Sequence, residues 1–276
     1  MKDLSGRVAA ITGAGSGIGR ALAVELAGKG THLALSDVDD VGLAETVGLC
    51  EGRGVKVTSA HLDVADREAM FAWADQVVAE HGRVNLIVNN AGVALGVTIA
   101  EMTYEDFTWI TEINLLGVVH GTQAFLPHLK ASGEGHVVNL SSVFGLLSIP
   151  GQSAYNMAKF GVRGFTDALR MELEIEGCPV SSTTVHPGGI KTNIARNGRM
   201  RESLGRLGSS AESVAAEFDK IAMTTPEKAA RQIVNGVQRN RRRILVGPDA
   251  KALDLVSRLP AGLYQRVLVA GAKRQR

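Results

Sequence analysis

The stretch Thr12-Gly13-Ala14-Gly15-Ser16-Gly17-Ile18-Gly19 decides the fold of this chain. It follows the apolar run Val8–Thr12, and a helical pattern begins directly after it with Arg20-Ala21-Leu22. Glycines at a strand-to-helix junction allow a tight turn, let the backbone approach a pyrophosphate and point the helix N-terminus at its negative charge. Alone, such a turn is a weak signal for dinucleotide binding.

Asp37 strengthens the dinucleotide interpretation. It follows the second expected strand, 20 positions after Gly17. A carboxylate at that place accepts hydrogen bonds from the ribose hydroxyls of adenosine. The alternative is an ordinary turn followed by a solvated aspartate.

Short runs rich in Val, Ile and Leu alternate with longer helical segments along the whole chain. This alternation predicts one domain, residues 1–276, with a doubly wound parallel sheet of Rossmann type, about seven strands, and helices on both faces. The expected strands are Val8–Thr12, His32–Ser36, Lys56–His61, Leu86–Asn89, His136–Leu140, Val180–His186 and Arg243–Val246. The expected helices include Gly19–Lys29, Arg67–His81, Thr103–Ser132 and Tyr155–Gly177.

The composition favours small-molecule chemistry. The formal net charge of +2 is too small to indicate nucleic acid or a membrane as the main partner. The basic runs Arg239–Arg243 and Lys273–Arg276 are expected to be solvated edges, with an anionic surface or partner as the alternative. No uncharged apolar run is long enough to span a membrane, so no integral membrane association is expected.

Cysteines and histidines give no sign of a disulfide framework or a metal site. Cys50 and Cys178 lack close spacing, which is typical of reduced thiols in a cytoplasmic protein. His120 and His128 lie on an expected helix without the spacing of metal ligands. The expected location is the cytoplasm.

The spacing Thr12-Gly13-x-x-x-Gly17-x-Gly19 resembles the short-chain dehydrogenase/reductase family rather than the more widespread GxGxxG fold. Further motifs follow in the order of that family, and the resemblance covers about Gly6 to Thr192. These motifs are Asp63-Val64, Asn89-Asn90-Ala91-Gly92, Asn114, Ser142, Tyr155-x-x-x-Lys159 and Pro187-Gly188.

The resemblance implies NAD as the cofactor and assigns residues that bind it. Neither Val38 after Asp37 nor Ser16 in the glycine turn supplies the positive charge that the 2′-phosphate of NADP needs. The implied contacts are Gly13, Ser16, Gly17, Ile18, Gly19, Asp37, Asp63, Val64, Asn90, Ala91, Gly92, Tyr155, Lys159, Pro187, Gly188, Ile190 and Thr192.

Tyr155 and Lys159 are spaced i and i+4, so they lie on one face of a helix. Tyrosine has an ordinary pKa of about 10 and is a poor proton shuttle at neutral pH. A nearby ammonium, together with an oxidised nicotinamide, would lower that pKa. Tyr155 is therefore expected to be the acid/base, and Lys159 also to hold the nicotinamide ribose.

Ser142 and Asn114 complete the expected catalytic group. Ser142 is expected to hold the substrate oxygen beside the phenol; Ser141 competes for this role, but strand alternation sends it to the opposite face. By resemblance, Asn114 holds a water in a proton relay from Lys159. His186, at a strand end, is expected to be packed rather than catalytic.

These residues favour an oxidoreductase that interconverts an alcohol and its ketone or aldehyde. The alternatives are a non-catalytic NAD sensor, since fold does not imply function, and an epimerase or dehydratase on the same fold. The substrate is expected to be a neutral, lipophilic secondary alcohol, because the stretches expected to line the pocket are apolar: Val93, Leu95, Val97, Phe144, Leu146, Leu147 and Ile149.

Two larger-scale expectations complete the sequence interpretation. A substrate lid is expected at about residues 190–225, mobile without ligand and ordered with it. A homo-oligomer, a tetramer or dimer, is expected through the segments Thr103–Ser132 and Tyr155–Gly177, because both carry small or apolar residues on several faces, among them Gly117, Val118, Gly121, Phe160, Gly164 and Ala168.

Overall fold

Strand β1 (Val8–Thr12) is buried on both of its faces. Its side chains alternate between two separate hydrophobic clusters: Ala9 and Ile11 pack into one, and Val8 and Ala10 into the other. A strand that is covered on both faces has a continuous apolar sequence, as is typical of parallel strands flanked by helices. The computed structural model describes residues 1–194, 196–207 and 222–274 of the chain.

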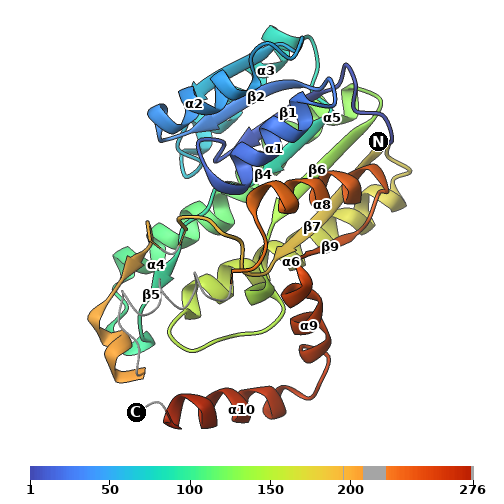
Figure 1. Cartoon of the computed structure of the whole chain (residues 1–276). Helices are drawn as coiled ribbons and strands as arrows, with labels where there is room; N and C mark the ends of the chain where they lie inside the picture. Colours follow the sequence, from blue (N-terminus) through green and yellow to red (C-terminus); the bar gives the residue numbers. More distant parts are fainter. Residues whose placement is uncertain (195, 208–221, 275–276) are drawn as a thin grey trace.

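The seven long strands form one parallel sheet with the order β3-β2-β1-β4-β6-β7-β9 (Figure 1). The order reverses direction between β1 and β4, which is the topological switch point where such sheets bind ligands. The other strands of this sheet are β2 (His32–Asp37), β3 (Val57–His61), β4 (Leu86–Asn89), β6 (Gly135–Leu140), β7 (Val180–Pro187) and β9 (Arg243–Val246). A separate parallel pair joins β5 (Leu95–Gly96) to β8 (Arg199–Met200).

Helices cover both faces of the sheet (Figure 1). One face packs against α1 (Gly17–Ala27), α2 (Asp40–Cys50) and α8 (Pro226–Gln238). The other packs against α3 (Arg67–His81), α5 (Gly117–Ala131) and α6 (Ser153–Ile175). The remaining described helices are α4 (Tyr104–Thr111), α9 (Pro248–Val256), α10 (Ala261–Arg274) and the short turns η1 (Ile99–Glu101), η2 (Glu112–Leu116), η3 (Val143–Gly145) and η4 (Glu202–Leu207).

The doubly wound fold predicted from the sequence is confirmed, and each of the seven strands ends within one residue of its expected bounds. The prediction of a single helix over Thr103–Ser132 is wrong. The chain forms α4, then the π-helical turn η2, then α5, and Gly117 N–H donates to the carbonyl of Glu112 five residues earlier. The π turn contains Asn114. Such turns inside helices often mark functional sites.

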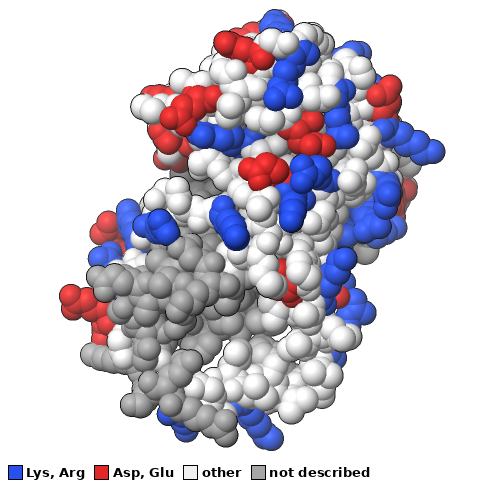
Figure 2. Space-filling model, in the orientation of Figure 1, with Lys and Arg blue, Asp and Glu red and all other residues white. Residues whose placement is uncertain are grey.

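Charges of both signs are mixed over the part of the surface formed by α2 and α3 (Figure 2). In the part of the chain that the structure describes, no helix is both long and apolar enough to cross a membrane.

Helix α5 lies so close to β4 that only glycine fits at the contact. A β-carbon at Gly121 would overlap Asn89 Oδ1. The Asn89 amide donates to Asn139 Oδ1 at 2.8 Å and to Thr122 Oγ1 at 3.2 Å, so this side chain is held in place. The contact therefore locks α5, and the π turn before it, onto the centre of the sheet.

Gly121→Ala should lower the free energy of unfolding by about 1–3 kcal/mol, because the added methyl overpacks a fixed polar network. Gly48→Ala on α2 is the matched control: its β-carbon would meet nothing within 4 Å, and removing a helix glycine should stabilise by up to about 1 kcal/mol. Urea unfolding of both variants measures the two changes. Equal stabilisation by both substitutions would contradict the close contact.

Candidate active site

The glycine turn after β1 forms a cradle that side chains would fill. Gly13 and Gly17 have positive φ angles of 64° and 52°, and a β-carbon at Gly19 would overlap the carbonyl oxygen of Gly13. Ser16 is the N-cap of α1 but makes no side-chain capping bond, and the first turn has no acidic residue. The N–H groups of Gly17, Ile18 and Gly19 therefore face the end of the sheet with the positive end of the helix dipole behind them.

Asn90 braces this turn from the neighbouring strand. Its amide nitrogen donates to the carbonyl oxygens of Thr12 at 2.9 Å and Gly13 at 3.0 Å. In return, Thr12 Oγ1 accepts from the backbone N–H groups of Asn90 at 3.0 Å and Ala91 at 3.1 Å. The loops after β1 and β4 are thereby joined at the switch point.

Asp37 lies at the end of β2, beside the glycine turn. Its Oδ2 accepts from Gly15 N–H at 2.7 Å and its Oδ1 from Asp39 N–H at 3.0 Å. Each carboxylate oxygen keeps a further lone pair for a ligand hydroxyl. The guanidinium of Arg20 donates to the carbonyl oxygens of Gly15 and Gly42, so this side chain fixes the rim of the turn.

Asp63 and Val64 follow β3 and form the next part of the same edge. The Asp63 side chain is exposed and accepts from Ala65 N–H at 2.9 Å. Val64 is 6% exposed and packs against α5, where a β-carbon at Gly117 would lie 2.7 Å from Val64 Cγ2. This packing sets the separation between the loop after β3 and helix α5.

The loop after β7 brings Pro187, Gly188, Ile190 and Thr192 to the same edge. Ile190 pairs with Thr224 in an isolated parallel bridge. A β-carbon at Gly17 would lie 3.1 Å from Thr192 Cγ2, so this loop meets the glycine turn across the switch point.

Asp249 positions this loop and was not expected from the sequence. Its Oδ2 accepts from Gly189 N–H at 2.6 Å, and a β-carbon at Gly188 would overlap the same carboxylate. Gly247-Pro248-Asp249 follows β9 directly, at the carboxyl edge of the sheet. That position after a predicted strand is the signal by which this residue could have been found.

Ser142, Tyr155 and Lys159 converge at this edge, as expected. Lys159 Nζ lies 5.7 Å from the centre of the Tyr155 ring and donates to the Leu140 carbonyl at 3.0 Å. All three side chains are at least nine-tenths buried. A β-carbon at Gly92 would lie 3.5 Å from Lys159 Nζ, so Lys159 adjoins the loop after β4.

The electrostatics of this group differ from the expected lowering of the tyrosine pKa. In the protein alone, burial raises the pKa of Tyr155, and the hydrogen bond with Ser142 opposes this only in part. Burial also lowers the pKa of Lys159 from 10.5 to about 8. Without a bound positive charge, desolvation outweighs the attraction between the two groups.

Asn114 holds the start of the loop after β4. Its Oδ1 accepts from Val93 N–H and its Nδ2 donates to the Val93 carbonyl, both at 2.8 Å. A β-carbon at Gly92 would lie 3.1 Å from Asn114 Oδ1, so the amide adjoins the region of Lys159. The amide keeps one N–H and one lone pair, which leaves capacity for a water.

Ser141 and His186 hydrogen-bond to the backbone of Lys159 and Ser142 respectively. Ser141 Oγ donates to the Lys159 carbonyl at 2.7 Å, which fixes its side chain on the backbone of α6. His186 Nδ1 donates to the Ser142 carbonyl at 2.8 Å, and burial lowers the pKa of this histidine to about 4. The imidazole is therefore neutral and holds the backbone at Ser142.

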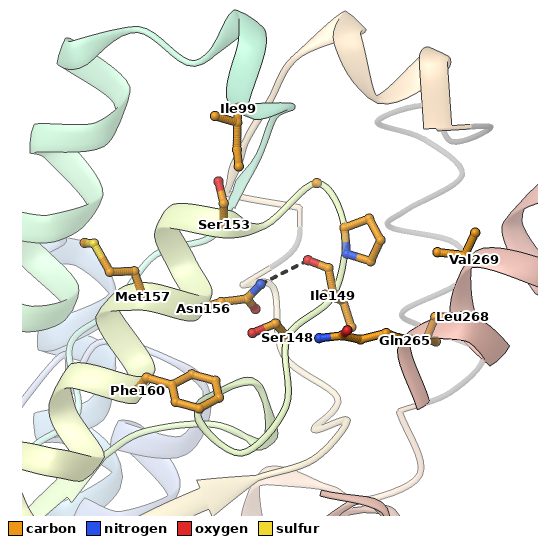
Figure 3. Close-up of a pocket in the computed structure, with 12 residues that line it drawn as sticks. Ile99, Ser148, Ile149, Ser153, Asn156, Met157, Phe160, Gln265, Leu268 and Val269 are labelled. Carbon is orange, nitrogen blue, oxygen red and sulfur yellow. Dashed lines mark hydrogen bonds between the residues drawn. The ribbon is translucent and has the colours of Figure 1, made fainter. Parts of the chain in front are cut away.

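An apolar cluster adjoins Tyr155. Its buried members are Leu95, Val97, Ile110 and Ala154, and the partly buried side chains packed on it are Val93, Met102, Phe107, Trp109 and Phe144. Ile149, which the sequence grouped with these residues, lies elsewhere. It lines a groove of about 660 Å³ between α10 and the face of α6 that carries Met157 and Phe160, not Tyr155 (Figure 3).

Part of the predicted lid, residues 190–225, packs beside the apolar cluster. Arg201 donates to both oxygens of the buried Asp106 carboxylate at 2.6 and 3.0 Å, and its neighbour Arg199 stacks on Trp109 at 4.0 Å. The pairing of β5 with β8 adds backbone contacts. Ala195 and residues 208–221 of the predicted lid lie outside the described residues.

No group of three or more His, Cys, Asp or Glu side chains in residues 1–194, 196–207 and 222–274 is arranged to hold a metal ion.

Comparison with known proteins gives a consistent match. The family model described as short chain dehydrogenase matches residues 7–203. The chain is 51% identical to the putative oxidoreductase SadH of Mycobacterium tuberculosis over 98% of this chain and 97% of the relative. It is 32% identical to estradiol 17-beta-dehydrogenase 11 of Macaca fascicularis over 97% and 83% of the two chains. A short-chain dehydrogenase/reductase from Burkholderia phymatum, solved in complex with NAD, superposes with a TM-score of 0.85 at 32% identity, covering 96% of each chain.

Lys159→Met should raise the free energy of unfolding by about 1–3 kcal/mol at pH 7. Because the folded-state pKa of Lys159 is lowered from 10.5 to about 8, the unfolded chain binds this proton more tightly, and the buried charge costs stability below about pH 8. The gain should shrink as the pH rises from 8 and vanish above 10.5. Urea unfolding at both ends of that range measures it.

Lys228→Met, at an exposed lysine of α8, is the matched control and should change stability little at either pH. A gain for Lys159→Met that did not depend on pH would point to packing rather than to the buried charge.

Proposed function

This chain belongs to the short-chain dehydrogenase family, and we propose that it is an NAD-dependent oxidoreductase that interconverts a secondary alcohol and its ketone. One observation carries the proposal. Ser142, Tyr155 and Lys159 meet at the carboxyl edge of the sheet, next to a glycine cradle braced by Asn90. A module that only senses NAD has no need of a buried phenol beside a buried ammonium.

The residues at this edge fit NAD. The glycine cradle and the uncapped start of α1 would hold the pyrophosphate, and Asp37 would accept from the adenosine ribose. Asp63 and Val64 would border the adenine, Lys159 would hold the nicotinamide ribose, and the loop Pro187–Thr192 would face the nicotinamide. When bound, NAD supplies or accepts the hydride of the reaction.

Tyr155 is the acid/base of the proposed mechanism. Its phenolic oxygen removes the hydroxyl proton of an alcohol or returns it to a ketone oxygen. Ser142 Oγ holds that substrate oxygen by a hydrogen bond, and its hydroxyl acts against the burial that raises the pKa of Tyr155. Two hydroxyl groups thus converge on the reacting oxygen.

Lys159 makes proton transfer possible at neutral pH. Burial alone raises the pKa of Tyr155, so the phenol needs an added positive charge before it ionises in the working range. A protonated Lys159, together with the positive charge of the oxidised cofactor, lowers it. Asn114 would hold a water that passes protons between Lys159 and solvent.

The substrate is a neutral, lipophilic alcohol or ketone. The surfaces next to Tyr155 are apolar, and residues 93–98 and 143–152 contain no Lys or Arg to bind a carboxylate or phosphate. The relative named for its action on estradiol supports this class of substrate. The clamp of Arg201 on Asp106 would hold the lid segment beside that surface, with residues 190–225 closing over the substrate.

The assembly is a homo-oligomer, a dimer or tetramer, formed through α6. Of the residues that suggested this interface, Gly117, Val118 and Gly121 are buried inside the subunit. The other three, Phe160, Gly164 and Ala168, are exposed on α6. With Met157, Met171 and Ile175, which the structure adds, they follow one stripe of the helix at helical spacing. Such a stripe is seldom left in water. The two free cysteines are consistent with the proposed cytoplasmic location.

Tyr155→Phe should reduce kcat by at least about 10³-fold and leave NAD affinity within a few-fold of the original, because only the proton-transferring hydroxyl is lost. Steady-state rates with a panel of lipophilic secondary alcohols, measured as NADH absorbance, and NAD titration by fluorescence check the two parts. An unmodified enzyme that binds NAD but turns over no alcohol or ketone would favour the sensor function.

Asp37 should make the enzyme prefer NAD over NADP. A 2′-phosphate near this carboxylate meets a like charge, worth roughly 4 kcal/mol at about 4 Å before solvent and side-chain movement reduce it. Arg20 is already bonded to the carbonyls of Gly15 and Gly42 and paired with Glu45 at 2.8 Å. We expect kcat/KM to favour NAD by about tenfold to a thousandfold.

Replacing Asp37 with Ala and Val38 with Arg together should narrow or reverse this preference, since it removes the repelling charge and supplies an attracting one. The single change Val38→Ala is the matched control and should leave the preference intact. Equal use of both dinucleotides by the unmodified enzyme would contradict the role of Asp37.

A further inference from the structure

Helix α10 stands away from the sheet and is joined to it through α9 (Figure 1). Of its described side chains, only Tyr264 and Ala272 are even half-buried. Among the described residues, one hydrogen bond ties it to the body, from Ser148 N–H to Tyr264 Oη at 3.4 Å. The helix nevertheless carries large apolar side chains in water, with Leu263 52% and Val267 65% exposed.

The apolar side chains of α10 lie on two different faces. Gln265, Leu268 and Val269 line the groove beside α6 (Figure 3). At roughly 100° per residue, Leu263 and Val267 lie on the opposite side of the helix, and Arg266 and Lys273 lie together on one flank, between this side and the groove. We call this second set of four residues the outer face of α10. Within it, Leu263 and Val267 point away from the groove.

The charge around the outer face has one sign. Residues 255–276 contain five basic residues, Arg258, Arg266, Lys273, Arg274 and Arg276, and no Asp or Glu. Since the whole chain has 30 basic and 28 acidic residues, the chain before residue 255 is acidic on balance. Figure 2 shows blue and white atoms without red along the lowest edge, where Figure 1 places α10.

We propose that the outer face of α10 binds the surface of an anionic phospholipid membrane. Leu263 and Val267 would enter the boundary between headgroups and acyl chains, while Arg266 and Lys273 contact lipid phosphates. No described helix is long and apolar enough to cross a bilayer, so the attachment is peripheral.

Charge argues against a second copy of the chain as the partner of this face. Two-fold pairing would place Arg266 and Lys273 of one subunit against the same residues of the other. Residues 255–276 hold no carboxylate side chain to separate them, and Asp254 is already paired with Arg258 at 2.9 Å and Arg243 at 3.1 Å. A membrane surface supplies both the anions and the apolar medium.

Co-sedimentation with vesicles tests the proposal. The full chain should sediment with vesicles of phosphatidylcholine mixed with phosphatidylglycerol, and far less with pure phosphatidylcholine. Salt at about 1 M, where the Debye length falls to about 3 Å, should weaken the binding. Arg266→Gln with Lys273→Gln should weaken it roughly 25-fold, about fivefold per cation. Leu263→Ser with Val267→Ser should weaken it by on the order of tenfold.

Matched controls change similar residues elsewhere. Arg239→Gln with Arg241→Gln in the other basic run, and Val41→Ser at an exposed apolar site of α2, should bind vesicles as the unmodified chain does. Tyr155→Phe should also bind them normally, which separates this proposal from that of the enzymatic activity.

Two results would overturn the proposal. One is a lack of preference for anionic vesicles at low salt, or a preference that the outer-face substitutions leave unchanged. The other is a fall in the particle mass measured by light scattering for Leu263→Ser with Val267→Ser, which would make the outer face a subunit interface.

Discussion

The hydrogen bonds from the Asn90 amide to the carbonyls of Thr12 and Gly13 hold together the two loops on which the site depends. The sheet order reverses between β1 and β4, so their following loops diverge over opposite faces of the sheet. Without a bridge across that gap, the glycine turn would have to hold its positive φ angles unaided. With the bridge, the turn stays open, and the start of α1 points at a fixed place.

The buried side chains of Lys159 and Tyr155 are poorly solvated by the protein alone. Lys159 is buried with one described hydrogen-bond acceptor, the Leu140 carbonyl, and its lowered pKa measures how poorly the protein alone solvates its charge. Tyr155 is affected in the opposite sense by the same burial. The protein alone therefore does not stabilise the charged form of either side chain. This fits a site that is completed by a charged cofactor and a substrate.

The segments outside the sheet are held in place by different contacts from those that hold the sheet strands. Around β1 and β4, each residue is fixed by close packing on both faces. Residues 199–201, in the segment predicted to be a lid, instead make polar contacts, among them that of Arg201 with Asp106. In the part of α10 that the structure describes, one hydrogen bond, from Ser148 N–H to Tyr264 Oη, ties the helix to the body. The proposed roles in substrate choice and membrane attachment therefore fall on segments that can change without disturbing the dinucleotide site.

The sequence by itself determined the parallel sheet, the glycine turn and the shared helix face of Tyr155 and Lys159. These follow from local signals: apolar runs of strand length, glycines at a strand-to-helix junction, and the i, i+4 spacing of Tyr155 and Lys159. Each signal lies within a few consecutive residues, so no knowledge of distant contacts was needed to see it.

Only the tertiary structure decided how that site is supported. The π turn at Asn114 arises where α5 is pressed against β4, and Asp249 reaches Gly189 from 60 residues away in sequence. The tertiary fold likewise separated Ile149 from the apolar cluster at Tyr155 and left α10 exposed. These features depend on contacts between segments far apart in the chain, and such contacts leave no periodic trace in the residues that make them.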